Sequence, residues 1–293
     1  MPDEHAGGGL TGWLWDNRRW VLDRARDLAD WFGQARSIPA QLPTDTEVET
    51  PKRRGILMIS PGGVGKTTFA RFISGERDIL TLWGQPYNES LGIERFAFAD
   101  PPIEIVVPPG QSHRRDTTWP QIEGELAAGA YRGVVLIVSY GHHSLGLTSY
   151  KRHRLYKGEF AQFLEDYTAD RRKDEQAVLD RLSPLLRACL EPVWLLTVVT
   201  KQDLWCDEQE PVERHYRGGR FAAEIDRIRQ KLGSRNFRSE LVFCSLTISN
   251  FVTGERELLR ENTAGYDSRR QIQSVHQLIE TLDALRTWEG AGT

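Results

Sequence analysis

The chain has 293 residues, of which 39% are hydrophobic and 27% are charged, and its formal net charge is -3. This balance excludes a largely disordered chain, which would be poorer in apolar residues and more uneven in charge. It also excludes a multispan membrane protein. The longest uncharged apolar runs, Val134–Val138 and Val193–Val199, fall far short of the roughly 20 residues that a spanning helix needs.

Cysteine and lysine usage add two expectations. The three cysteines are widely spaced and form neither a disulfide framework nor a metal signature. Residues 1–9 are acidic and then Gly-rich, unlike a signal peptide, so we expect a reducing, cytoplasmic setting. Only seven of the 38 basic residues are lysines, which makes a lysine inside a motif an uncommon choice.

Residues 1–53 are predicted to form a region of their own. Residues 10–35 have the apolar spacing of an amphipathic helix, and residues 37–54 have the Pro-rich, polar composition of a linker. The apolar stripe consists of Leu14, Val21, Ala25, Leu28 and Phe32. Four of the nine tryptophans lie in the same helix: Trp13, Trp15, Trp20 and Trp31.

Three interpretations of this Trp-rich helix stay open. It packs on its own domain, it binds a partner or a second copy, or it lies in a membrane interface, where Trp is favoured. The polar face carries nearly equal numbers of acids and bases, which argues against strong binding to anionic lipids.

From residue 54 to residue 293 the pattern alternates between strands and helices, which predicts an α/β domain with a mainly parallel sheet. The predicted strands are residues 55–60, 93–99, 103–107, 133–139, 193–200 and 241–245. The predicted helices are residues 66–74, 158–190, 220–232 and 271–288.

The strongest motif is residues 60–68, Ser-Pro-Gly-Gly-Val-Gly-Lys-Thr-Thr, between a strand and a helix. This is the context of a phosphate-binding loop, whose backbone N–H groups point at phosphate oxygens. Lys66 is predicted to reach the β- and γ-phosphates, Thr67 to bind Mg²⁺ and Thr68 to contact the α-phosphate. Ser60 replaces the usual first glycine, which requires an ordinary backbone conformation there. The remaining loop residues predicted to hold phosphate are Gly62, Gly63, Val64 and Gly65.

Two later motifs indicate a guanine site. Thr200-Lys201-Gln202-Asp203 follows a buried strand and resembles the guanine-reading motif of GTPases. An Asp carboxylate there accepts hydrogen bonds from guanine N1–H and the 2-amino group, and the Lys stem lies over the base. Cys244-Ser245-Leu246 ends the last strand, where GTPases carry a backbone N–H that contacts guanine O6, so Ser245 and Leu246 are assigned to nucleotide binding.

With these motifs, residues 54–290 resemble the Ras-like small GTPase superfamily. The family has Asp-x-x-Gly-Gln where this chain has Val107-Pro108-Pro109-Gly110-Gln111. The resemblance implies that Gly110 binds the γ-phosphate, that Gln111 orients the attacking water, and that both act with Lys66 in catalysis. Val107 replaces the Asp that holds Mg²⁺ through water, for which Asp100 and Glu104 are weak substitutes.

The resemblance implies a P-loop NTPase three-layer sandwich with a mainly parallel six-stranded sheet. It also implies a molecular switch that binds GTP, GDP and Mg²⁺ and, given Val107, hydrolyses GTP slowly. Protein partners are expected at the switch regions or the N-terminal helix. Peripheral membrane contact is less favoured and nucleic acid is not expected. The hydroxyl candidates for the first switch are Thr81 and Ser90. Two alternatives remain: a pseudo-GTPase interaction module and an ATP-dependent P-loop enzyme.

Three further features lie outside the common core. Residues 140–157 are basic and His-containing with no acid, which is typical of a solvated loop and permits an anionic partner. Residues 158–190 extend the domain with a long helical region. Arg114 and Arg115 are candidates for an arginine finger supplied in cis.

Overall fold

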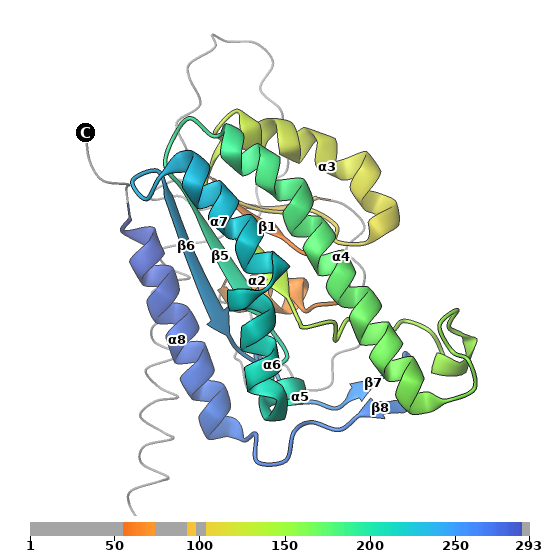
Figure 1. Ribbon diagram of the computed structural model, residues 1–293. Coiled ribbons are helices and arrows are strands. Elements are labelled where there is room, and N and C mark those ends of the chain that lie inside the picture. The colour runs from red at the N-terminus through yellow and green to blue at the C-terminus, as the bar shows by residue number, and fades with distance from the viewer. Residues whose placement is uncertain (1–54, 74–92, 98–103, 289–293) are drawn as a thin grey trace, which may run out of the picture.

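The computed structural model describes residues 55–73, 93–97 and 104–288. The predicted Trp-rich helix and linker, the first-switch candidates Thr81 and Ser90, and Asp100 lie outside these residues. The central sheet has six strands in the order β2-β3-β1-β4-β5-β6, and a separate hairpin is formed by β7 and β8 (Figure 1). The strands are β1 (Gly55–Ile59), β2 (Glu94–Ala97), β3 (Glu104–Val107), β4 (Tyr131–Val138), β5 (Val193–Val199), β6 (Phe237–Phe243), β7 (Phe251–Val252) and β8 (Leu258–Arg260).

The strand pairing confirms a mainly parallel sheet. Strand β1 pairs in parallel with β3 and β4, and the ladder continues in parallel from β4 through β5 to β6. Only β2, at the edge, runs antiparallel to its neighbour β3. Because parallel neighbours need crossover connections, helices must cover the faces of this sheet.

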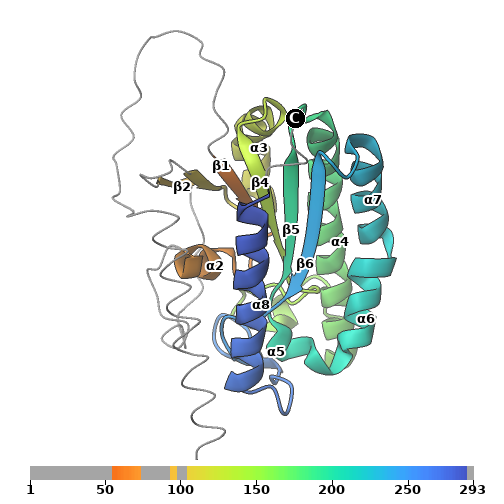
Figure 2. The same cartoon turned by 90° about the vertical axis from the view of Figure 1, so that its left-hand side faces the viewer.

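The helices form a layer on each side of the sheet (Figure 2). On one face lie α2 (Lys66–Ile73) and α8 (Ser268–Arg286), and on the other lie α3 (Ser112–Ala127), α4 (Phe160–Ala188) and α7 (Arg220–Leu232). Alternate residues of β1 show the division, since Ile56 and Met58 join the first core and Leu57 and Ile59 the second. The short elements α5 (Gln202–Trp205), α6 (Gln209–Glu213) and the π-helical turn η4 (Arg214–Gly218) precede α7.

Several predicted bounds change. The last sheet strand begins at Phe237 rather than Leu241, and α8 begins at Ser268 rather than Gln271. The helix α3 was missed because Pro120 and a polar sequence weaken its apolar periodicity. The β7–β8 hairpin was missed because strands of two and three residues leave no alternation to detect.

Candidate nucleotide site

The loop between β1 and α2 has the backbone that its glycines allow. Gly63 has φ +79°, and a Cβ there would lie 2.7 Å from the Ser144 nitrogen, so both conformation and space demand glycine. Among the described residues, only Tyr140, Lys201 and Arg256 have a positive φ without being glycine. Ser60 is not one of them, so serine is compatible with the first position of the motif.

Lys66 is the first residue of α2 and is buried, with 7% of its surface exposed. Its Nζ donates to the Pro108 carbonyl at 2.6 Å. The ammonium therefore lies between the β1–α2 loop and the segment that follows β3. A buried cation at a helix N-terminus provides two favourable fields for an anion at one place.

The segment after β3 packs directly against the β1–α2 loop. A Cβ on Gly110 would lie 2.8 Å from the carbonyl oxygens of Ser60 and Pro61, so only glycine permits this approach. The Cα of Gln111 lies 3.4 Å from the position of a Cβ on Gly62. The structure thus brings Gly110 and Gln111 to the predicted phosphate site.

Val107, at the position of the family's Asp, is fully buried in the core shared by α2 and α8. Its side chain therefore offers no oxygen to a metal. Thr67, on the first turn of α2, is the predicted metal ligand that lies within the described residues, and its hydroxyl suits Mg²⁺, which prefers oxygen ligands and keeps several waters.

Arg115 braces the segment after β3, and its finger role stays a prediction. Its Nε donates to the Gly110 carbonyl at 2.8 Å, and its two terminal nitrogens donate to Asp174 of α4 at 2.8 and 3.0 Å. Such a bidentate pair holds the guanidinium in one place. The finger role of Arg114 stays a prediction.

The segment after β5 is tied to the β1–α2 loop by hydrogen bonds. Thr200 Oγ1 donates to the Val64 carbonyl at 2.7 Å, and Lys201 Nζ donates to the Gly63 carbonyl at 3.1 Å. Lys201 has φ +59° and also donates to the His142 carbonyl at 2.5 Å. Burial lowers the pKa of Lys201 to about 8, against the opposing charges of Asp203 and Glu175.

Asp203 is buried and already oriented. Its carboxylate accepts hydrogen bonds from Ser245 Oγ and, at 2.9 Å, from the backbone nitrogen of Ser249. Burial raises the pKa of Asp203, and these two hydrogen bonds oppose that rise. Each carboxylate oxygen has a second lone pair, so the group can still accept from a base.

Ser245 contributes through its side chain as well as its backbone. Its hydroxyl holds Asp203, and its backbone N–H donates to Ser274 Oγ of α8 at 3.3 Å. That N–H is therefore directed at α8 rather than at a guanine O6. Leu246, the other residue assigned there, is buried in the core beside α8. Ser249 was missed because it lies in a polar loop that carries no motif.

Two of the three histidines in the basic segment belong to the interior, whereas His153 is partly exposed. His142 and His143 are each 2% exposed, and burial lowers the pKa of both, that of His142 to about 3. His143 Nε2 lies 2.9 Å from Glu175 Oε1 of α4, a buried contact that no sequence pattern indicated. The exposed basic residues are Lys151, Arg152, Arg154 and Lys157.

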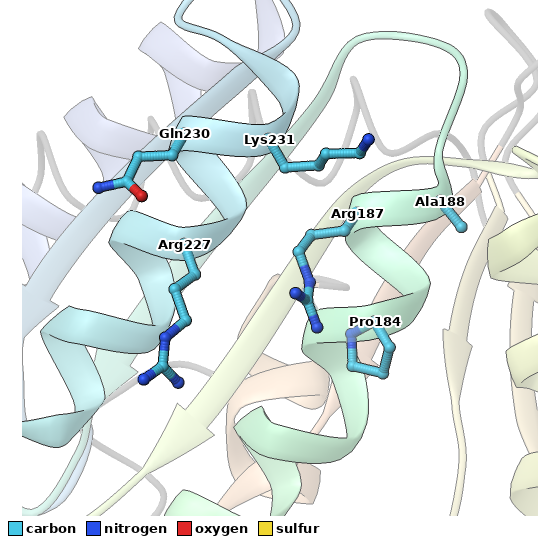
Figure 3. Close-up of a pocket in the computed structure, with 6 residues that line it drawn as sticks. All are labelled: Pro184, Arg187, Ala188, Arg227, Gln230 and Lys231. Atoms are coloured by element: carbon cyan, nitrogen blue, oxygen red, sulfur yellow. The ribbon is translucent and has the colours of Figure 1, made fainter.

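Within the part of the chain that the structure describes, no group of three or more His, Cys, Asp or Glu side chains could hold a metal ion. In the same residues, no helix is long and apolar enough to cross a membrane. A depression of about 540 Å³ lies away from the phosphate loop, between the C-terminal parts of α4 and α7 (Figure 3). Its cationic residues are Arg187, Arg227 and Lys231, none of which was predicted as a site residue.

Comparison with known proteins finds similarity among solved structures but none among family models or curated proteins. A solved structure that is similar is the ADP-ribosylation factor-like GTP-binding protein, or small COPII coat GTPase SAR1, from Encephalitozoon cuniculi in complex with GDP. It shares 13% identity over 94% of this chain and 93% of that chain, with a TM-score of 0.34. The α/β fold with its five parallel strands is itself consistent with that of P-loop GTPases.

Proposed function

We propose that this chain is a guanine-nucleotide-binding switch that binds GTP and GDP with Mg²⁺ and hydrolyses GTP slowly. The observation that carries the proposal is the connection between two motifs 135 positions apart. Thr200 and Lys201 donate to the carbonyls of Val64 and Gly63, so the base motif and the phosphate motif form one continuous surface.

Base selection rests on Asp203. Its fixed carboxylate accepts from the two donors on the Watson–Crick edge of guanine, N1–H and the 2-amino group, and adenine does not present this pair. The stem of Lys201 supplies an apolar surface for the base while its Nζ remains hydrogen-bonded. An ATP-dependent enzyme, the alternative, would have no use for this arrangement.

Phosphate binding rests on the β1–α2 loop with Lys66. Thr67 would hold Mg²⁺ together with phosphate oxygens of the nucleotide, and the ion would neutralise charge on those oxygens. Gln111 would orient the attacking water, with Gly110 on the γ-phosphate. The residues predicted to bind phosphate suit a nucleotide. They suit the metal ion less well, because Val107 is apolar.

Val107 also favours a second candidate, a pseudo-GTPase that binds GTP but scarcely hydrolyses it. Single-turnover GTP hydrolysis in Mg²⁺ separates the two. A slow GTPase loses roughly tenfold or more of its rate in Gln111→Leu, because hydrolysis depends on water positioning. A rate unchanged by that substitution would overturn the catalytic assignment of Gln111, and a wild-type chain that binds GTP without measurable hydrolysis would belong to the pseudo-GTPase class.

As a switch, the chain would signal to a protein partner through the segments that contact the γ-phosphate or through its N-terminal region, in a cytoplasmic setting. Peripheral membrane contact is the less favoured alternative for that region, and no nucleic-acid partner is proposed. The near-neutral net charge of -3 supports this choice.

The decisive test of base selection is Asp203→Asn. Asn presents a donor where the carboxylate presents an acceptor, so it should weaken GDP binding by roughly a hundredfold and favour xanthosine diphosphate, which has a carbonyl in place of the 2-amino group. Asp207→Asn is the matched control, since Asp207 lies one turn further on and pairs with Arg260 instead. A guanine preference that survives Asp203→Asn, or ADP competing as well as GDP, would refute the proposal.

A further inference from the structure

Helix α4 carries two successive carboxylates, Asp174 and Glu175, that hold opposite walls of the candidate site. Asp174 binds Arg115, which holds the segment after β3. Glu175 binds the segment after β4, residues 139–144, which contacts the phosphate loop and Lys201. Adjacent residues of one helix are therefore linked to both sides, Asp174 through Arg115 and Glu175 through the segment after β4.

On the γ-phosphate side, the link runs from Asp174 through Arg115 to the Gly110 carbonyl. In a trans peptide the C=O and the following N–H point in opposite directions. Fixing the Gly110 oxygen on Arg115 therefore directs the Gln111 N–H to the other side. The Gln111 nitrogen indeed lies 3.6 Å from the position of a Cβ on Gly62, in the phosphate loop. The ion pair thus sets the orientation of the Gly110–Gln111 peptide against that loop.

On the base side, Glu175 accepts four hydrogen bonds. Oε1 accepts from the backbone nitrogens of Ser139 and Gly141 at 2.9 and 3.0 Å and from His143 Nε2 at 2.9 Å. Oε2 accepts from the Tyr216 hydroxyl of η4 at 2.7 Å. Burial raises the pKa of Glu175, but the hydrogen bonds of His143, Ser139 and Tyr216 together hold it below its usual value. The group is therefore a carboxylate, and it clamps the whole turn.

The clamped turn leads directly to the nucleotide motifs. Ser144, at its end, donates from its backbone nitrogen to the Gly63 carbonyl at 2.9 Å and from Oγ to the same oxygen at 3.1 Å. The His142 carbonyl, inside the turn, accepts from Lys201 Nζ. Glu175 thus fixes the turn that carries two groups beside Lys201, the His142 carbonyl and the Ser144 hydroxyl.

Stability alone is a poor explanation for Glu175. Its side chain is fully buried, and burying a carboxylate costs several kcal/mol that well-packed apolar residues would not incur. What four directed hydrogen bonds supply is a single orientation of the turn. Tyr216, the fourth donor, lies in a π-helical turn, a local irregularity that is frequent at functional sites.

We propose that α4 couples the two halves of the nucleotide site, with Asp174 as the positioning residue for the γ-phosphate half and Glu175 as the positioning residue for the base half. The inference rests on the proposed function, because it assumes that the site binds guanine nucleotides. It goes beyond that function by assigning separate roles to two residues that lie outside every nucleotide motif of the sequence.

The two assignments predict different selectivities. Asp174→Asn removes the charge that holds Arg115, so binding of a non-hydrolysable GTP analogue should weaken about tenfold while GDP binding changes less than about twofold. Glu175→Gln disturbs the segment that both nucleotides share, so both affinities should fall by a similar factor of about ten. For Asp174→Asn the measurement is the ratio of the two dissociation constants, which a loss of stability alone would leave unchanged. For Glu175→Gln this ratio stays constant, so the pH dependence of binding is the measurement that separates a positioning role from lost stability.

A pH profile gives Glu175 a second readout. Its charge raises the pKa of Lys201, so Glu175→Gln should move the pH midpoint of nucleotide binding downward. Should Glu175→Gln fail to fold, Tyr216→Phe removes one donor from the clamp and keeps the charge. It should then weaken GDP and the GTP analogue equally without moving that midpoint.

The matched control is Asp170→Asn, one turn earlier on α4, where Asp170 pairs with Arg154 and Arg171 instead. It should change neither affinity. Asp174 lines an open depression of about 280 Å³, so its substitution is not a core change. If the wild-type chain binds no guanine nucleotide, the proposed function fails. If it does bind, and Asp174→Asn leaves the GTP-to-GDP ratio unchanged, the coupling role is overturned on its own.

Discussion

The base side of the candidate site consists of hydrogen-bonded polar residues, whereas the metal side has an apolar residue at a key position. On the base side, Thr200, Lys201 and Asp203 are held by hydrogen bonds with three other segments of the chain. On the metal side, the position that would hold Mg²⁺ through water is the fully buried Val107. Under the proposed function, this contrast predicts a chain that binds and selects a nucleotide more effectively than it hydrolyses one.

The largest expected effect comes from Lys66, which is predicted to bind the phosphates of both GDP and GTP. Lys66→Ala removes the buried ammonium that we expect to contact the β- and γ-phosphates, so binding of GDP and GTP should fall by roughly a hundredfold or more. Fluorescence titration with labelled GDP measures this. The control is Lys231→Ala, since Lys231 is exposed on α7. A Lys66→Ala variant that binds like wild type would show that the β1–α2 loop does not bind phosphate.

A smaller effect tests the metal side. Thr67→Ala should weaken GTP binding about tenfold in Mg²⁺ and change it little in EDTA, because the hydroxyl acts through the ion. Thr68→Ala should instead weaken binding equally in both buffers, since its predicted contact is with the α-phosphate. Equal losses for the two variants in Mg²⁺ and in EDTA would show that Thr67 is not a metal ligand.

The smallest effect sharpens the base side. Because the pKa of Lys201 is lowered to about 8, the unliganded site loses its charge above that pH, whereas an anionic ligand favours the charged lysine. GDP affinity should therefore fall about fourfold between about pH 7 and about pH 8.5. Lys201→Met should abolish the dependence, and a slope that survives this substitution would place the titrating group elsewhere.

The same group affects folding with the opposite sign. The unfolded chain keeps the ordinary lysine pKa of 10.5 and so binds more protons than the folded chain between about pH 8 and that value. The contribution of Lys201 to the free energy of unfolding is therefore unfavourable at neutral pH, and it is relieved as pH rises through this window. Thermal unfolding of wild type and Lys201→Met at two pH values measures it.

Local motifs allowed the sheet and the candidate binding segments to be predicted. The apolar runs that became β1, β4 and β5 were visible because strands buried on both faces are continuous apolar stretches. The phosphate loop and the Thr200–Asp203 motif were visible because a few neighbouring residues carry their chemistry.

Long-range partners could not be predicted in the same way. Glu175 lies in a polar stretch of α4, and its donors are 32 to 41 positions away. Arg115 was identified as a charge near Gln111, but its brace to Asp174 depends on a helix 59 positions further on. His142 and His143 were predicted to lie on a basic surface, because residues 140–157 contain no acid. The acid that pairs with His143 is Glu175, which comes from α4.

The most direct test of the central claim is displacement of a labelled GDP from the wild-type chain by unlabelled GDP and by ADP. The geometry of Asp203 predicts that GDP displaces the label at a concentration at least about a hundredfold lower than ADP does. Equal displacement by the two nucleotides, or no binding of the label at all, would contradict the assignment of this site to guanine nucleotides.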